Sequence, residues 1–312
     1  MVNSIHGLTM GNNQTYFELS TSSVFIHGNK SQVKFDYYGQ SAQRELGDLI
    51  FIISVVFNNK KYLEKFTINQ FKKDKRSSKN ILWSMDNKEQ LYLLSRFPTF
   101  KGVRGSLIPM RDFNLQNYSG SLGSYGFLQT PGDFAFVSAT KLESYLGSRK
   151  TINGNDLYTF HSSLSNYYWW PFEIGNLIDI EEWFYICHKL CRHERFFYGL
   201  EQCWPNIGIF GNCHYTQNIH DFVDKYLRLC IGEPTLSEIG INNLSAYAFL
   251  VDLLQLVKRI REEELTKFVD SFFSYHYAGG QGGREISENI EFDPKGGGVG
   301  IIYTTINLGE GE

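Results

Sequence analysis

No hydrophobic run in this 312-residue sequence is long enough to cross a membrane. The longest apolar stretch, residues 49–57, falls far short of the roughly 20 residues that a membrane-spanning helix needs. The opening residues, MVNSIHGLTMGNNQ, also lack the basic start and the apolar core of a secretory signal peptide. These absences predict a cytoplasmic protein that does not act at a membrane.

Signature motifs of several enzyme classes are also missing. The sequence has no G-x-x-x-x-G-K-[ST] phosphate loop and no G-x-G-x-x-G that opens a helix after a strand. Its glycine groups at 279–280 and 296–298 therefore favour loop flexibility over nucleotide binding. A G-x-S-x-G elbow and an H-E-x-x-H helix are absent as well, so nothing points to a serine hydrolase or a zinc peptidase.

Cysteine is scarce and is confined to one region. The five cysteines are Cys187, Cys191, Cys203, Cys213 and Cys230. An odd number in a chain without a secretory signal predicts reduced thiols rather than disulfides. The first two fall on the apolar face of a predicted helix, which favours core packing over a zinc site, although zinc stays open as the alternative.

Charge of neither sign is in large excess, but it is unevenly distributed. The formal net charge of -3 argues against a surface that is basic throughout, as a general nucleic-acid coat would be. Between Lys60 and Lys79, however, eight basic residues stand against Glu64 and Asp74. Basic charge is therefore concentrated in one segment of a slightly acidic chain.

The N-terminal half has the patterns of strands. Two apolar segments, about 48–57 and 62–71, are joined through Asn58-Asn59-Lys60, and asparagine tolerates the left-handed backbone of a tight hairpin. A helix is predicted within ILWSMDNKEQLYLLSRFP and ends at Pro98. From residue 97 to about 158, glycine, serine and aromatic residues predict irregular β structure and loops.

The pattern becomes helical after residue 177. Helices are predicted in IDIEEWFYICHKLCRHERFFYGL, NIHDFVDKYLRLCIG and NLSAYAFLVDLLQLVKRIREEELTKFVDSFFSYH, followed by one β run, VGIIYTTI. We therefore predict an α/β (α+β) fold with a mixed β-sheet. Residues 1–165 would form an α/β domain, and residues 166–312 a mainly helical domain with a glycine-rich tail and a terminal strand.

The predicted hairpin also carries the residue types of a metal-dependent hydrolytic site. Asp48 opens its first strand, and Gln70 and Lys72 lie near the end of its second. Because side chains alternate along a strand, Gln70 and Lys72 share one face, and Phe71 points to the other. Phosphodiester hydrolysis needs a metal ion that stabilises developing charge and acidifies the attacking water. Mg²⁺ requires few protein oxygens because it keeps several of its waters.

With ELGDLIFI followed by KFTINQFKK, this segment resembles the PD-(D/E)XK nuclease superfamily, in the Q-x-K form of Mrr-type restriction endonucleases and prokaryotic defence-associated proteins. The resemblance implies a restriction-endonuclease-like mixed β-sheet core and Mg²⁺- or Mn²⁺-dependent cleavage of DNA. It also implies an effector role in restriction or anti-phage defence. The resemblance covers residues 45–73, no proline precedes Asp48, and an amide stands at position 70 where the superfamily usually has an acid.

The same resemblance implies roles for single residues. Asp48 would be the metal-binding acid, Gln70 would be the second metal ligand, and Lys72 would orient or polarise water and phosphate. A further acid would be Glu45, with Glu18 as the alternative.

Two interpretations of the hairpin remain open. The first is a nuclease that works as a homo-oligomer or with a partner protein of a defence system. The second is a non-catalytic nucleic-acid- or protein-binding module of a multi-subunit defence complex, in which the hairpin is structural. Lys73, Lys75 and Arg76 extend the second strand into a basic cluster that either contacts DNA phosphates or is simply solvated.

Overall fold

The computed structural model describes residues 5–6, 18–27, 31–74, 81–129, 132–163, 213–227, 229–237, 243–260, 262–277 and 298–308. Its helices are α1 (Lys88–Arg96), α2 (Ala139–Leu146), α3 (Gly154–Ser163), α5 (Ile219–Leu227), α6 (Leu244–Arg259) and α7 (Glu263–Phe273). Its strands are β1 (Ile5–His6), β2 (Glu18–His27), β3 (Gln32–Tyr37), β4 (Gln40–Glu45), β5 (Leu49–Phe57), β6 (Lys60–Lys72), β7 (Leu82–Ser84), β8 (Phe100–Gly102), β9 (Gly123–Leu128), β10 (Phe134–Ser138), β11 (Thr151–Asn153), β12 (Tyr215–Thr216), β13 (Glu233–Ser237), β14 (His276–Tyr277) and β15 (Gly298–Asn307). The predicted α/β fold class is confirmed.

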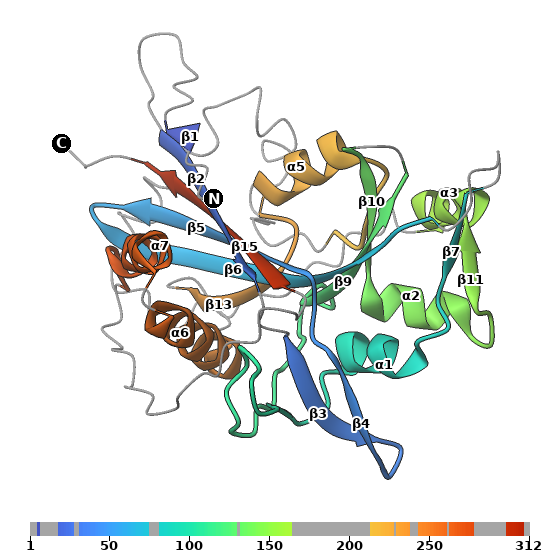
Figure 1. Ribbon diagram of the computed structural model, residues 1–312. Coiled ribbons are helices and arrows are strands. Elements are labelled where there is room, and N and C mark those ends of the chain that lie inside the picture. Colours follow the sequence, from blue (N-terminus) through green and yellow to red (C-terminus); the bar gives the residue numbers. More distant parts are fainter. Residues whose placement is uncertain are drawn as a thin grey trace, which may run out of the picture.

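Ten of these strands form one mixed sheet that crosses the molecule (Figure 1). Its main path is β1-β2-β15-β5-β6-β9-β10-β12, and β13 and β14 also pair with β6. β15 lies between β2 and β5, antiparallel to the former and parallel to the latter. The long strand β6 therefore has β5 on one edge and β14, β13 and β9 in turn along the other.

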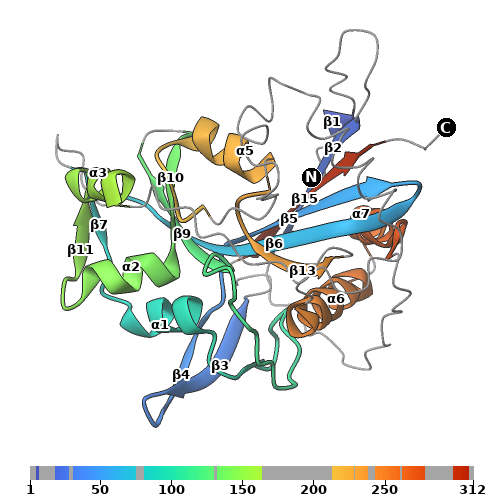
Figure 2. The same cartoon turned by 180° about the vertical axis from the view of Figure 1, so that it is seen from behind.

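Apolar side chains alternate between the two faces of the sheet. Ile50 and Ile52 of β5 pack on the side of α1, α2, α6 and α7, whereas Phe51 and Ile53 pack on the side of α5. Figures 1 and 2 show α5 across the sheet from the other four helices. Because both of its faces are covered, β5 reads in the sequence as the continuous apolar run LIFIISVVF.

The predicted hairpin is present in the structure. β5 and β6 pair antiparallel from Leu49 opposite Asn69 to Phe57 opposite Lys60. Asn58 and Asn59 form the turn with φ angles of 49° and 59°, the left-handed backbone that a two-residue hairpin turn requires. The two asparagines thus place the start of β5 beside the end of β6.

The helix predicted before Pro98 is shorter than its pattern suggested. α1 begins at Lys88 and is capped by Phe97, and residues 82–84 form β7 instead. The long helical segment near the C-terminus is two helices, α6 and α7. The helix predicted over residues 178–200 lies outside the described residues.

Strands from both sides of residue 165 share the sheet. β15 pairs with β2 and β5, β12 pairs with β10, and β13 and β14 pair with β6. The C-terminal part therefore contributes strands as well as helices. The domain boundary expected near residue 165 falls beside residues 164–212, which lie outside the described residues, and it stays a prediction.

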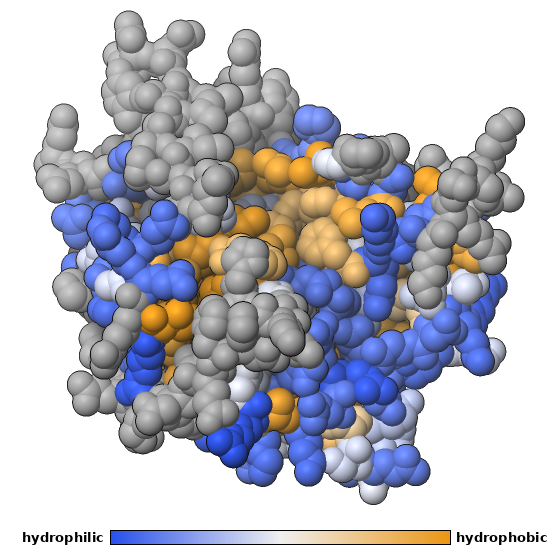
Figure 3. Space-filling view, viewed as in Figure 1, coloured by the Kyte–Doolittle hydropathy of each residue, from blue (hydrophilic) through white to orange (hydrophobic). Residues whose placement is uncertain are grey.

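The surface is polar on the side of α1. Hydrophilic side chains cover the lower right of the view, over α1, α2 and the β3–β4 hairpin, whereas apolar side chains reach the surface over the middle of the sheet (Figure 3). In the part of the chain that the structure describes, no helix is long and apolar enough to span a membrane.

Candidate functional site

Asp48 lies immediately before β5, and neighbouring segments fix its backbone. Its N–H donates to the carbonyl of Asn69 at 2.8 Å, and its carbonyl accepts from the N–H of Gly300 in β15 at 2.9 Å. The preceding residue, Gly47, is so close to β6 that a Cβ atom would lie 2.6 Å from a side-chain atom of that strand. Ser31 Oγ donates to the Gly47 carbonyl at 2.7 Å. Asp48 is thus positioned by β6, by β15 and by the segment that leads into β3.

Gln70 and Lys72 lie on the face of β6 that the sequence predicted. Gln70 Nε2 donates to Asp48 Oδ2 at 2.5 Å, and the Phe71 main-chain N–H donates to the same oxygen at 2.7 Å. Gln70 is buried, whereas Asp48 and Lys72 are half-buried. The structure therefore brings Asp48 and Gln70 into direct contact, with Lys72 beside them.

Lys72 is joined to this pair by Gln90 of α1. Lys72 Nζ donates to Gln90 Oε1 at 3.3 Å, and Gln90 Nε2 donates to Gln70 Oε1 at 2.5 Å. Gln90 Nε2 also donates to the main-chain carbonyl of Glu45 at 3.2 Å. A continuous series of hydrogen bonds thus links Lys72, Gln90, Gln70 and Asp48, and we call these four residues the polar row.

The N-terminal end of α1 holds Gln90 at the site. Asn87 Oδ1 caps the helix by accepting from the Gln90 main-chain N–H at 3.0 Å, and it also accepts from Arg44 Nε at 3.1 Å. An asparagine followed three residues later by a glutamine is the spacing of a capping box, in which the glutamine side chain turns back to the cap. Here the Gln90 side chain reaches the polar row instead.

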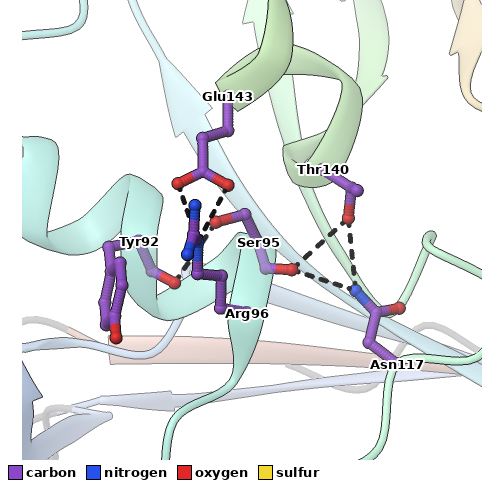
Figure 4. Close-up of polar contacts among 6 residues, drawn as sticks. All are labelled: Tyr92, Ser95, Arg96, Asn117, Thr140 and Glu143. Atoms are coloured by element: carbon purple, nitrogen blue, oxygen red, sulfur yellow. Dashed lines mark hydrogen bonds and ion pairs between the residues drawn. The ribbon is translucent and has the colours of Figure 1, made fainter.

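The C-terminal end of α1 is fixed to α2 and to the segment before β9 (Figure 4). Arg96 and Glu143 form an ion pair at 3.0 Å. The Ser95 carbonyl accepts from Asn117 Nδ2 and from Thr140 Oγ1, each at 3.4 Å. With both of its ends attached, α1 holds Gln90 against the end of β6.

Tyr125 of β9 borders the site on the side opposite Asp48. It is paired with Gln70 in the parallel register of β6 and β9, and Lys72 Nζ lies 5.6 Å from the centre of its ring. Its hydroxyl is buried and has no hydrogen-bond partner among the described residues. Burial raises the pKa of Tyr125, and the Asp48 charge raises it further, so the hydroxyl stays protonated. It is a donor that a water or ligand oxygen would satisfy.

Burial dominates the electrostatics of Asp48. It raises the pKa of the Asp48 carboxyl above its ordinary value of 3.8, while the Phe71 N–H, the Gln70 amide and the Lys72 ammonium group act in the opposite direction. A carboxylate that loses hydration gains more from a nearby cation than a solvated one does. Asp48 is therefore a suitable anchor for a metal ion.

The structure places only one of the two candidates for a further acid, Glu45 and Glu18, near Asp48. Glu45 contributes its main-chain carbonyl to the polar row, and its side chain is half-buried. Glu18 pairs with Asn307, which lies beside Val56 at the end of β5 remote from Asp48. The alternative in which Glu18 supports the site is therefore wrong, because the length of a strand separates the two carboxylates.

The basic surface near the hairpin is smaller than the sequence count suggested. Lys73 is exposed just after β6, and Lys75 and Arg76 lie outside the described residues. Lys61 and Lys65 are buried, the first in an ion pair and the second with its ammonium group on a main-chain carbonyl. These two lysines balance interior acceptors and do not belong to the exposed basic surface.

The site offers few oxygen ligands to a metal ion. Among the described residues, no group of three or more His, Cys, Asp and Glu side chains could hold one. Asp48 Oδ2 accepts both hydrogen bonds, which leaves Oδ1 for a cation, and Gln70 turns its N–H group toward Asp48. A Mg²⁺ or Mn²⁺ ion bound here would have Asp48 as its one carboxylate ligand from the polar row and would take most of its other ligands from waters and substrate oxygens.

Comparisons with protein-family models, with curated proteins and with solved structures gave no match for this chain. Function must therefore follow from the geometry and chemistry of the site.

Proposed function

We propose that this protein is a metal-dependent DNA endonuclease, which hydrolyses phosphodiester bonds. The observation that carries the proposal is the arrangement of Asp48, Gln70 and Lys72 at one end of the β5–β6 hairpin. A partly desolvated carboxylate binds a cation, and a lysine held nearby stabilises the charge that develops on a phosphate. Asp48 and Lys72 are residues of these two kinds at one end of the hairpin, and this supports the proposal.

Each residue has a role in this proposal. Asp48 would hold Mg²⁺ or Mn²⁺, and the bound metal supplies Lewis acidity and an acidified water. Gln70 hydrogen-bonds Asp48 and, with its amide turned, would add an oxygen ligand. Lys72 would contact the scissile phosphate, and the unsatisfied Tyr125 hydroxyl would donate to a water or oxygen atom within the site. Glu45 supports the site through its carbonyl group.

The Q-x-K resemblance also suggests a biological role for the proposed nuclease. It supports an effector of prokaryotic restriction or anti-phage defence that works in the cytoplasm. The enzyme would act as a homo-oligomer or with a partner protein of the same system. Lys73, Lys75 and Arg76 follow the site along the chain and would contact neighbouring phosphates of the DNA.

A second candidate function is a non-catalytic binding module. One observation favours it: the only carboxylate of the polar row already accepts two hydrogen bonds, and the amide beside it presents a donor. In a purely structural site, every member of the row would be satisfied without a metal ion.

Cleavage of supercoiled plasmid by the purified full chain separates the two functions. With Mg²⁺ or Mn²⁺ the wild-type protein should nick DNA, and EDTA should stop the reaction. Lys72→Ala should lower the rate about 100-fold, because it removes a cation from the transition state. Asp48→Ala should abolish both cleavage and metal binding.

Lys34→Ala is the matched control, since this exposed lysine of β3 lies outside both the polar row and the proposed DNA contacts. It should leave the cleavage rate unchanged. Cleavage that persists at the wild-type rate in folded Asp48→Ala would exclude the proposed active site.

A further inference from the structure

The hydrogen bonds of the polar row run in one direction, and the groups at its two ends enforce that direction. An ammonium group only donates, so Gln90 must turn Oε1 toward Lys72. Gln90 Nε2 then faces Gln70, which must accept through its own Oε1. Gln70 is left with Nε2 toward Asp48, whose carboxylate only accepts.

The Glu45 carbonyl fixes the orientation of Gln90 a second time. A main-chain carbonyl only accepts, and it lies 3.2 Å from Gln90 Nε2. If the Gln90 amide turned over, its oxygen would face the Glu45 carbonyl, and its N–H group would face the Lys72 ammonium group. Gln90 is buried, so water would not readily replace these contacts.

A locked Gln90 restricts Gln70 in turn. For Gln70 Oε1 to face a cation on Asp48, the Gln70 amide would have to rotate and bring its N–H group against Gln90 Nε2. Two donors would then oppose each other in a buried place. The orientation that makes Gln70 a metal ligand is therefore the one that Gln90 disfavours.

We propose that Gln90 is a positioning residue that keeps the Gln70 amide nitrogen toward Asp48 and thereby limits the metal affinity of the site. This inference rests on the proposed function, because it concerns the metal ion that Asp48 would hold. In the absence of metal, Gln90 keeps Lys72 and Asp48 joined through Gln70. Gln70 can bind the metal ion through its amide oxygen only if the Gln90 amide turns over or the Gln90 side chain moves away.

Two substitutions of Gln90 test the proposal. One removes the hydrogen-bond donor that faces Gln70, and the other replaces it with an acceptor. Gln90→Met keeps the length of the side chain and the helical preference but removes the N–H group, so that Gln70 is free to turn. Gln90→Glu keeps an acceptor for Lys72 but cannot donate, so Gln70 must present its N–H group to the new carboxylate and its oxygen to Asp48. Leu93→Met, a buried change on the same helix outside the polar row, is the control.

Calorimetric titration of the full chain with Mn²⁺ measures affinity without reference to cleavage. Gln90→Met should bind Mn²⁺ about fivefold more tightly than the wild type, the gain expected from removing one opposed hydrogen bond. Gln90→Glu should bind more tightly still, and Leu93→Met should bind as the wild type does. Gln70→Glu, which supplies a second carboxylate, should also bind more tightly.

The outcomes distinguish this inference from the proposed function. If folded Gln90→Met binds Mn²⁺ no better than the wild type while Gln70→Glu does, Gln90 has only a structural role and the inference is wrong. If Gln90→Met tightens binding but no variant cleaves DNA, the inference stands and the nuclease does not. If no variant binds Mn²⁺, both are wrong.

Discussion

Asp48 is held in surroundings that disfavour its charge. Burial raises the pKa of its carboxyl despite three groups that act in the opposite direction. The neighbouring Tyr125 hydroxyl is buried without a hydrogen-bond partner among the described residues, a condition that costs on the order of 1–3 kcal/mol. Costs of this kind are commonly retained where a ligand later offsets them.

Replacement of Asp48 should reveal this cost as a change in stability with pH. The folded-state pKa lies above the ordinary 3.8, so the folded protein binds a proton more tightly, and its stability falls as pH rises from about 3.8 through the raised pKa. Asp48→Asn removes the titration. At pH 7 the variant should therefore be more stable than the wild type, and the difference should vanish below pH 3.8.

Urea unfolding of both proteins across this pH range provides the measurement. A variant that is less stable than the wild type at pH 7 would contradict the expectation. On the proposed function, saturating Mg²⁺ should stabilise the wild type alone, because the Asp48 carboxylate would hold the ion and the amide of the Asp48→Asn variant would not.

The sequence could predict three members of the polar row but not the fourth. Asp48, Gln70 and Lys72 belong to one hairpin, so strand periodicity alone places them together. Gln90 comes from a helix whose packing depends on distant contacts, and its spacing from Asn87 is that of a residue in a helix cap rather than of a site residue. The position of Tyr125 beside the site could not be predicted either, because its register with Gln70 is set by the crossover from β6 to β9.

Among the elements, β9 shows why a strand can look irregular in the sequence. Its glycines predicted loops, yet they are required for close packing. A Cβ atom on Gly123 would lie 2.1 Å from the Leu94 carbonyl of α1, and one on Gly126 would lie 2.5 Å from the Phe71 ring. The β5–β6 hairpin was easier to predict, since its asparagine turn and the apolar run of β5 are local features of the sequence.

The junction of β10, α2 and β12 contains a buried imidazole. Ser138 Oγ and His214 Nδ1 share a hydrogen bond at 3.0 Å, and the Ser138 N–H donates to the His214 carbonyl at 2.9 Å. Burial, and to a lesser extent the charge of Lys141, lower the pKa of His214 to about 4. The imidazole is therefore neutral where it joins these elements.

Acid should weaken this junction. The folded-state pKa of about 4 lies below the ordinary 6.5, so the unfolded chain binds more protons between these values and stability falls as pH drops through them. The loss from His214 should be on the order of 3 kcal/mol. His214→Asn keeps an acceptor for Ser138 and should lose less stability from pH 6.5 to 4, as thermal unfolding would show.

The exposed Gln217, three positions along the chain, offers the control for this prediction. Gln217→Asn removes no titratable group and should follow the wild-type pH profile. Identical profiles for His214→Asn and the wild type would show that His214 does not titrate with folding.

At the scale of the whole molecule, the sheet depends on pairing between distant segments. Thr21 and Thr304, 283 positions apart, approach within 3.3 Å where β2 meets β15. The sequence predicted the β run VGIIYTTI but assigned it to the end of a helical domain. Nothing in the local sequence of a strand specifies its partners, so the place of β15 between β2 and β5 could not be predicted.

Core substitutions in β15 should therefore destabilise the entire fold. Ile301 is fully buried in the core, whereas Ile302 points to the other face and is half-buried. Ile301→Ala should cost about 2–5 kcal/mol and Ile302→Ala clearly less. Urea unfolding monitored by far-UV circular dichroism would compare the two, and equal losses would contradict the central position of β15.

The hydrogen bond from Gly300 to the Asp48 carbonyl links this topology to the time course of synthesis. A ribosome that has made β5 and β6 has already supplied Asp48, Gln70 and Lys72, but the strand that completes their sheet is translated much later. Until β15 emerges, Asp48 lacks the strand whose Gly300 N–H binds its carbonyl. On the proposed function, DNA cleavage would therefore have to wait until β15 has been translated and has paired with β5.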